Sequence, residues 1–390
     1  MSIKIFKNGK VVLPNGVCDS AVVVNDGKII EISENPKYEG AEIIDAHGGY
    51  ILPGFIDIHV HGGGGADFMD GSAEAMETVI STHLKHGTTS IAPTTMSAPI
   101  EEIVATFSTY RKVLERGVCK ANLLGLHLEG PFISPKMCGA QRLDLIISPT
   151  EKEIALLKEN SDIISRISCA PEVEGVTEMA KALLPKGIQF SMGHTNATYE
   201  EAEDAFDGGF TSITHMYSAT SGFHKVNQKV HIGVTQAGYG IDGLFVELIG
   251  DGCHVPKELL RLVARFKSAD KVCLVTDAMR AAGTDVTESY LGSISPENRV
   301  IIEDGVAKLP DRSFFAGSIG TMDRALRFAV LTAKMPIHEV SRMVSLTPAR
   351  LLGIDDKKGS LEVGKDADIV IMDPKLEIKS VYVNARKIDI

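Results

Sequence analysis

Two histidines separated by one residue stand in the run Asp57-Ile58-His59-Val60-His61. Side chains alternate between the two faces of a β-strand, so His59 and His61 would point the same way and could share one metal ion. The alternative is a pair of core histidines satisfied by hydrogen bonds, and an isolated pair does not decide between the two. The glycine run 62–65 favours the metal, because glycine lets the backbone approach a ligand closely.

A carboxylate and two further histidines end other apolar segments. Glu129 follows Leu126-His127-Leu128, and a buried carboxylate without a partner is costly, so a cation is expected beside it. His194 and His215 each end a segment of their own. One Glu and two His suit Zn²⁺ or another divalent transition metal that keeps an open position for water. A lone histidine favours a core role, but the whole set favours a metal.

Asp277 and His254 lie in two more polar loops. An aspartate at the position of Asp277 is commonly a helix N-cap. Beside metal ligands it is better interpreted as a general base that takes a proton from the attacking water and returns it to the leaving group. His254 is interpreted equally well as a substrate contact or as an ordinary loop residue. Structural or surface roles are expected for the remaining candidates, His47, His83, His86 and His338.

The elements that must position these side chains follow an alternating pattern. Short apolar segments predict strands over 54–59, 88–93, 122–128, 163–170, 188–193, 211–215, 244–250 and 271–276. Helical spacing is found at 73–86, 100–116, 151–159, 176–184, 199–206 and 256–266, with further helices near 321–334 and 338–344. This order predicts an α/β fold, a (β/α)8 barrel whose polar residues gather at the carboxyl ends of its strands. The segment 215–243 is a poor helix and is expected to be a functional loop.

Both ends of the chain have a hairpin-rich β pattern. Residues 3–44 alternate in polarity around Asn-Gly and Asp-Gly turns, and 359–390 have the same texture. We therefore expect a small β-sandwich domain formed from both ends, whose parts share a sheet. The predicted domains are 1–53 and 355–390 for the sandwich and 54–354 for the barrel.

Composition limits the partners. The 390 residues have 44% hydrophobic and 23% charged side chains, which excludes a disordered chain or a small disulfide scaffold. The net charge of −11 has the wrong sign for binding nucleic acid. No apolar stretch is long enough to span a membrane, and the first ten residues lack the apolar core of a signal peptide. The six cysteines are scattered, so a cytoplasmic protein with reduced thiols is expected.

The motifs resemble those of a known family. Residues 53–61 are similar to the opening signature of metal-dependent amidohydrolases, and His127-Leu128-Glu129-Gly130-Pro131-Phe132, Gly193-His194-Thr195-Asn196-Ala197, Asp251-Gly252-Cys253-His254, Val275-Thr276-Asp277-Ala278 and Ala316-Gly317-Ser318 resemble N-acetylglucosamine-6-phosphate deacetylases. The resemblance extends along the whole chain, as far as the segment 364–370. It implies hydrolysis of the N-acetyl group of an amino-sugar phosphate, giving acetate and the free amine.

The resemblance also implies roles for single residues. Glu129, His194 and His215 would hold the main metal, Asp277 would be the acid and base, and His59 and His61 make a second metal plausible. The metal would be Zn²⁺, with Fe²⁺, Co²⁺ or Mn²⁺ as alternatives. The family is commonly dimeric, so a homodimer is expected. The sugar site would be lined by Ala140, Gln141, Ser218, Ala219, His254, Phe315, Ala316 and Gly317.

One departure from the family concerns the phosphate. Members usually have an arginine after the sixth strand, which crosses to the neighbouring subunit's phosphate, but Val226 stands at that position here. Lys225 or Lys229 would supply a charge instead, although lysine cannot reproduce the two-pronged contact of a guanidinium. Both lysines could equally be solvated loop charges.

Other functions remain to be weighed. The substrate could be a different N-acetyl amino sugar, such as N-acetylgalactosamine 6-phosphate or a sugar without phosphate. A cyclic-amide hydrolase related to dihydroorotase would share the barrel but typically bridges its metals with a carboxylated lysine, and Glu129 stands at that position here. A scaffold protein without a metal would have no reason to retain Glu129, His194, His215 and Asp277 together.

Overall fold

Two β-sheets at one end of the molecule pack face to face in the computed structural model, which describes residues 3–389. One sheet has the order β5 (Lys28–Ser33), β4 (Ala21–Asn25), β1 (Lys4–Lys7) and β6 (Glu42–Asp45). The other has the order β26 (Arg386–Lys387), β25 (Ile378–Val383), β24 (Ile369–Met372), β7 (Tyr50–Pro53), β2 (Lys10–Leu13) and β3 (Gly16–Cys18). The antiparallel pairing of β24 with β7 confirms that both chain ends contribute to one sheet.

Apolar side chains from both sheets fill the space between them. Phe6 and Val22 of the first sheet form one buried cluster with Ile51, Ile369 and Tyr382 of the second. The Phe6 and Tyr382 rings meet edge to face, with centroids 4.8 Å apart. The predicted small β-sandwich is therefore present.

The barrel consists of parallel strands in the predicted order. They are β8 (Phe55–Val60), β11 (Thr88–Thr95), β12 (Asn122–Leu123) with β13 (Leu126–Glu129), β14 (Ile164–Cys169), β15 (Gln189–Met192), β16 (Phe210–Ile213), β19 (Phe245–Ile249) and β20 (Val272–Val275). The predicted third strand is broken at Gly125, whose φ of +88° turns the backbone between its two halves. The barrel closes where Val60, at the end of β8, bridges in parallel to Ala278 after β20.

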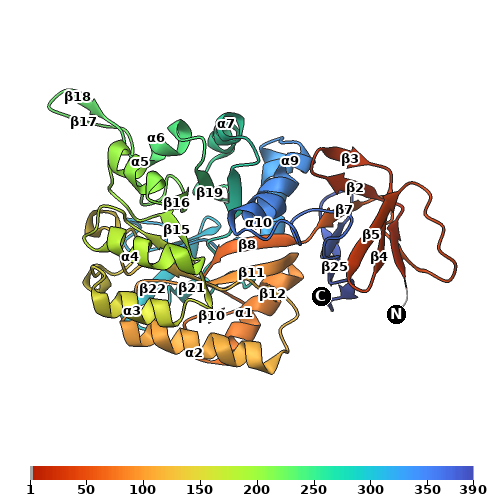
Figure 1. Cartoon of the computed structure of the whole chain (residues 1–390), viewed down its shortest axis with the longest axis horizontal. Helices are drawn as coiled ribbons and strands as arrows, with labels where there is room; N and C mark the ends of the chain where they lie inside the picture. The colour runs from red at the N-terminus through yellow and green to blue at the C-terminus, as the bar shows by residue number, and fades with distance from the viewer. Residues whose placement is uncertain (1–2, 390) are drawn as a thin grey trace.

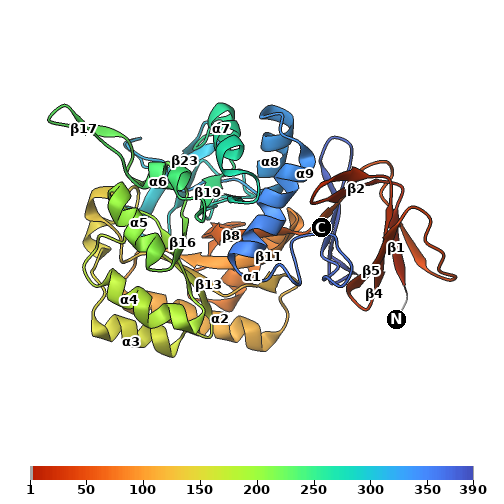
Figure 2. The same cartoon turned by 45° about the horizontal axis from the view of Figure 1, so that its top comes forward.

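Helices cover the outside of the barrel, as Figure 1 shows. They are α1 (Ala73–Lys85), α2 (Ile100–Arg116), α3 (Glu151–Glu159), α4 (Val176–Leu183), α5 (Tyr199–Asp207), α6 (Val234–Gly240), α7 (Lys257–Lys267), α8 (Met322–Arg327), α9 (Ile337–Ser341) and α10 (Thr347–Leu351). Helix α9 lies on the side of the barrel that faces the terminal sheets (Figures 1 and 2). None of the helices described by the structure is long and apolar enough to cross a membrane.

Two segments differ from the expected pattern. The segment 215–243, expected to be a loop, contains the hairpin β17 (His224–Val226) and β18 (Lys229–His231) and the short helix α6. The hairpin projects away from the barrel, as both views show (Figures 1 and 2). The second segment follows β20 and forms a small antiparallel sheet of β21 (Glu288–Tyr290), β22 (Arg299–Glu303) and β23 (Val306–Lys308).

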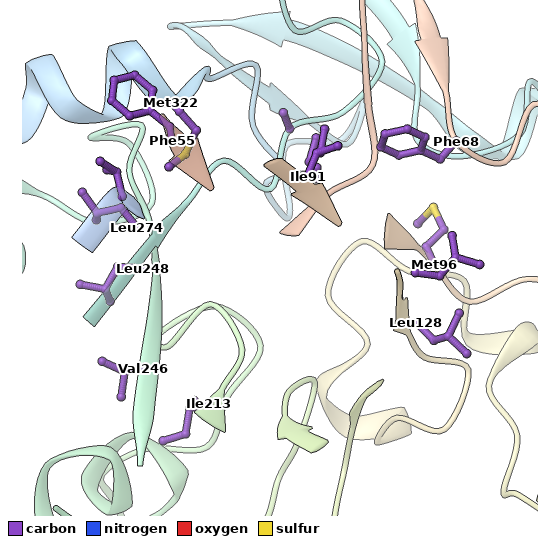
Figure 3. Packing of buried hydrophobic residues seen from close by; sticks show 14 of the residues in the cluster. Phe55, Phe68, Ile91, Met96, Leu128, Ile213, Val246, Leu248, Leu274 and Met322 are labelled. Carbon is purple, nitrogen blue, oxygen red and sulfur yellow. The ribbon is translucent and has the colours of Figure 1, made fainter. Parts of the chain in front are cut away.

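The large core lies between the barrel strands and the helices. Figure 3 shows several of its residues, including Ile91 on β11, Leu128 on β13, Val246 on β19, Leu274 on β20 and Met322 on α8. The alternate residues on these strands point into the barrel. In β8 these are Asp57 and His59, which are fully buried. The interior is thus partly polar, and its charged groups need partners.

Candidate metal centre

A cavity of about 530 Å³ opens at the carboxyl ends of the barrel strands. It is the place where barrel enzymes build their active sites. Its walls include His61, Glu129, His194, His215 and Asp277. The residues expected from the sequence to chelate a metal or transfer a proton, which come from five different strand ends, therefore meet at one place.

Three of these residues have an unusual backbone conformation. The φ angles are +47° at His194, +30° at His215 and +47° at Asp277, in the left-handed region that residues with a Cβ seldom adopt. Each stands two residues after the end of a strand. Such conformations cluster at functional sites, because the surrounding structure holds a side chain where function requires it.

Glu129 is the centre of the cluster. Its Oε1 lies 2.8 Å from His215 Nε2 and 3.2 Å from His194 Nε2. The same carboxylate faces the histidine pair of β8, with Oε1 3.3 Å from His59 Nε2 and Oε2 3.4 Å from His61 Nε2. These residues form two groups that could each hold a metal ion, and both groups include Glu129. One contains His59 and His61, and the other contains His194 and His215.

Asp277 faces the histidine pair from the opposite side of the barrel seam. Its Oδ1 lies 3.2 Å from His61 Nε2 and 3.5 Å from His59 Nε2. Its main-chain N–H donates to the carbonyl of His59 at 2.9 Å, which fixes the end of β20 against β8. Asp277 is thus close enough to both histidines to exchange a proton with a molecule bound between them.

The hydrogen bonds of the ring nitrogens support a metal in this cluster. His194 Nδ1 lies 2.9 Å from the carbonyl of Met137, and His215 Nδ1 lies 3.0 Å from that of Ser218. A carbonyl only accepts, so each Nδ1 carries a proton, and each Nε2 is the ring nitrogen that a metal ion in the cluster would use. His59 Nε2 and His61 Nε2 stand only 3.3 Å apart. A metal ion takes the place of protons on such nitrogens, and four imidazole nitrogens around one buried carboxylate fit a divalent metal.

The charges in the cluster shift its pKa values strongly. Burial opposes ionisation of Glu129, but the nearby His59 and His194 outweigh it and hold the pKa of the carboxyl well below its usual range. Burial also opposes protonation of His59, yet Glu129 and Asp277 raise the pKa of that ring well above its ordinary value. The two carboxylates therefore create a strongly negative site that attracts positive charge, whether protons or a metal ion.

A ring of buried groups behind the cluster was not identified from the sequence. Glu247 on β19 accepts from His59, with Oε2 3.1 Å from Nδ1, and its other oxygen pairs with Arg166 of β14. Asp57 accepts from the Thr276 hydroxyl at 2.6 Å, and burial raises the pKa of its carboxyl to about 7. A partner on the outer nitrogen fixes the tautomer and orientation of a metal-binding histidine. The signal in the sequence was a charged residue in the middle of an otherwise apolar strand.

The cavity is also lined by most of the residues expected at the sugar site. Gln141 donates to Glu129 Oε2 at 2.9 Å, and His254 is held by Asp251, with Nδ1 2.7 Å from Oδ2. The expected residues that line the cavity are Ala140, Gln141, Ser218, Ala219, His254, Phe315 and Gly317. Ala316 is buried between the last two.

The two lysines proposed for the phosphate do not reach the cavity of their own chain. Lys225 is on β17 and Lys229 is on β18, both exposed on the projecting hairpin, and neither is among the described residues that line the cavity. The lining instead includes Tyr217, Arg312 and Phe314, which the sequence did not single out. Arg312 and Phe314 come from the loop after β23, a segment with no predicted element.

The barrel fold and the His and Glu residues of the site agree with the family that the sequence matches. Residues 50–388 match the amidohydrolase family, and the chain belongs to it. The protein is a hydrolase with candidate metal-binding groups in its barrel. Within this family it is similar to N-acetylglucosamine-6-phosphate deacetylases.

The similarity covers nearly all of the chain. The N-acetylglucosamine-6-phosphate deacetylase of Bacillus subtilis is 35% identical over 382 residues, which are 96% of this chain and 94% of that protein. An N-acetylgalactosamine-6-phosphate deacetylase of Escherichia coli is 30% identical and covers 94% of each chain. The crystal structure of N-acetylglucosamine-6-phosphate deacetylase from Pasteurella multocida superimposes with a TM-score of 0.91, at 31% identity and 99% coverage of both chains.

Proposed function

We propose that the protein hydrolyses the N-acetyl group of N-acetylglucosamine 6-phosphate, giving glucosamine 6-phosphate and acetate. The observation that carries this proposal is the convergence of four imidazole Nε2 atoms on Glu129, with Asp277 beside two of them, at one cavity. The similarity to the Bacillus subtilis and Pasteurella multocida deacetylases supports the amino-sugar substrate. The Escherichia coli relative makes N-acetylgalactosamine 6-phosphate the second candidate.

Glu129, His194 and His215 would hold the main metal ion, and His59 and His61 would hold a second one together with Glu129. Zn²⁺ suits these donors best, and Fe²⁺, Co²⁺ and Mn²⁺ are the alternatives. A bound divalent ion supplies a Lewis acid that lowers the pKa of water and polarises the acetyl carbonyl. The carboxylate in place of a lysine at the bridging position argues against a cyclic-amide hydrolase.

Asp277 moves the proton in this scheme. Its Oδ1 accepts a proton from the attacking water as the new C–O bond forms. The same carboxyl then donates that proton to the sugar nitrogen as the C–N bond breaks, so acetate and the free amine leave and Asp277 is an anion again. His61 and His59, 3.2 and 3.5 Å away, lower the pKa of the buried Asp277 carboxyl against the opposing effect of burial, so it begins the cycle ionised.

The test combines a metal and a residue. Acetate release should be lost in a strong chelator and return with Zn²⁺. Asp277→Asn should lower kcat by ~10²–10⁴-fold, because the amide cannot accept the proton. Its metal content, measured by elemental analysis, should stay at that of the wild type. The exposed Asp285→Asn is the matched control. Full activity in a metal-free preparation, or wild-type turnover in Asp277→Asn, would contradict the proposal.

The division of the chain and its setting are also proposals. The terminal sheets support a sandwich domain of 1–53 and 355–390 around a barrel domain of 54–354. Six free cysteines support a reducing compartment such as the cytoplasm.

Exposed apolar side chains on and beside the projecting hairpin support a homodimer that covers them; they are Phe223, Val226 and Val230. Light scattering on the purified protein measures the last point directly, and a monomer at micromolar concentration would exclude it.

A further inference from the structure

The cavity that holds the candidate metal centre is poor in fixed positive charge. Among the described residues that line it, Arg312 is the only arginine or lysine. The histidines of the lining belong to the candidate metal cluster, apart from His254, which is engaged by Asp251. A guanidinium stays charged at every physiological pH, and its fork of N–H donors is well suited to a phosphate dianion.

The loop that carries Arg312 is held in one shape by its own hydrogen bonds. Leu309 N–H donates to the Phe314 carbonyl at 3.0 Å, and Arg312 N–H donates back to the Leu309 carbonyl at 2.8 Å. The Ser313 hydroxyl donates to Asp311 at 2.6 Å. Arg312 itself has a φ of +61°, which few residues with a Cβ adopt. The loop is therefore ordered before a substrate arrives, which lowers the entropic cost of binding.

The same loop reaches the sugar side of the cavity. Phe315 packs its ring on His254, with centroids 4.8 Å apart and planes at 60°. Phe314 and Phe315 are 54% and 43% exposed and both line the cavity, so they offer apolar surface beside the guanidinium. A phosphorylated sugar presents this combination, an apolar ring face joined to a dianion.

The guanidinium of Arg312 is only partly engaged. Its Nε and Nη2 donate to Glu303 Oε1 and Oε2 at 2.8 and 3.2 Å. The Arg312 side chain is 60% exposed, so water and salt screen this ion pair, which contributes little to stability. Glu303 is shared with Lys308, whose Nζ lies 3.1 Å from Oε1. Within the described residues Nη1 of Arg312 has no hydrogen bond, and a phosphate can take that side of the fork.

We infer that Arg312 binds the 6-phosphate of the substrate, in the same chain whose metal centre performs the hydrolysis. The inference rests on the proposed deacetylation and specifies how that site recognises the phosphate. It assigns to an arginine in the loop after β23 the role that sequence comparison suggested for Lys225 or Lys229. Those lysines lie on β17 and β18. This hairpin projects away from the barrel (Figure 1), so within one chain the lysines do not line the cavity.

The test compares two substrates, N-acetylglucosamine with and without the 6-phosphate, by acetate release. In Arg312→Ala, the ratio of kcat/KM for the phosphorylated to the unphosphorylated sugar should fall about tenfold or more, mainly through KM. Arg312→Lys should restore only part of it, because an ammonium is a point charge. The wild-type ratio should decline with added salt. Arg299→Ala is the matched control, since Arg299 pairs in the same way with Glu288 on the same small sheet and does not line the cavity.

The outcomes separate this inference from the proposed function. An unchanged ratio of kcat/KM for the two sugars in Arg312→Ala would overturn the role of Arg312. A fall in that ratio in the Lys225→Ala and Lys229→Ala double variant, and not in Arg312→Ala, would also overturn it. Equal kinetics of the wild type on both sugars would also overturn it, while leaving deacetylation in place. Failure of the metal-loaded wild type to release acetate from any N-acetyl amino sugar would overturn the proposed function itself.

Discussion

Replacing Glu247 by leucine should strongly destabilise the barrel. Glu247 is fully buried, and it is the counter-charge of Arg166, whose side chain is only 1% exposed. Burial opposes ionisation of Glu247, but Arg166 and His59 outweigh it and lower the pKa of the carboxyl, so the pair is ionic at neutral pH. Without Glu247, the guanidinium would retain only two partners among residues 3–389, the Ile58 carbonyl at 3.3 Å and the Ser212 hydroxyl at 3.4 Å.

The magnitude follows from the burial of both partners. Removing one partner of a buried ion pair leaves an uncompensated charge and typically costs about 3–5 kcal/mol. Replacing both partners by apolar residues of similar volume is often neutral, because neither charge then needs solvation. The double variant Arg166→Met with Glu247→Leu should therefore recover most of the loss, so the two substitutions should be strongly non-additive.

The assay is thermal unfolding in the presence of a chelator, because bound metal would add stability of its own. For a chain of this length, with an unfolding entropy of ~2.1 cal/mol/K per residue, the single variant should unfold roughly 4–6 °C below the wild type. The double variant should lie within about 2 °C of the wild type. An unchanged Tm in Glu247→Leu would refute this reasoning. So would a double variant whose loss of Tm equals the sum of the losses in the two single variants.

Two further predictions concern residues that support the site from behind. His83 donates to the Gly62 carbonyl, and burial lowers the pKa of its ring to about 4, whereas an unfolded histidine has a pKa of ~6.5. Between these two pH values the unfolded state binds more protons than the folded state. About 3 kcal/mol of stability should therefore be lost as the pH falls from 6.5 to 4. His83→Gln should flatten that part of the Tm profile against pH, and an equally steep profile in the variant would assign the loss to other groups. Gly193→Ala would place a Cβ 2.7 Å from the Thr214 Cβ, so it should cost ~1–3 kcal/mol and weaken metal binding by displacing His194. Gly16→Ala, which meets nothing within 4 Å, is its control in Tm and metal titration, and equal effects of the two substitutions would contradict the steric argument.

Local sequence patterns were sufficient for the main elements. The spacing of apolar residues in α2 and α3 matches the period of a helix, and the structure gives these helices the predicted bounds of 100–116 and 151–159. The barrel strands also appear in the predicted order, because each is a short apolar run between polar loops. The fold class was predictable for this reason, since a strand followed by a helix repeats along the chain and only a few architectures accommodate that repeat.

The elements that sequence reasoning missed have weak periodicity. Helix α6 spans only seven residues and includes two glycines, so its pattern is too short to distinguish from a loop. The sheet of β21, β22 and β23 has strands of only three to five residues, in which buried, half-buried and exposed side chains are mixed. Such strands are stabilised by pairing with one another and by contacts with the barrel. Neither kind of contact can be inferred from the local pattern of apolar and polar residues.

The sequence by itself determined which residues could do chemistry. Glu129, His194, His215 and Asp277 each stand at the end of an apolar strand, where barrel topology brings them to one rim. The tertiary structure alone decided which charges face each other, because contacts between residues far apart in the chain leave no local signal. It pairs Glu247 with Arg166 inside the barrel, places Arg312 in the cavity wall, and carries Lys225 away on a hairpin. Long-range packing therefore decides which side chains line the cavity, while strand order sets the candidate metal centre.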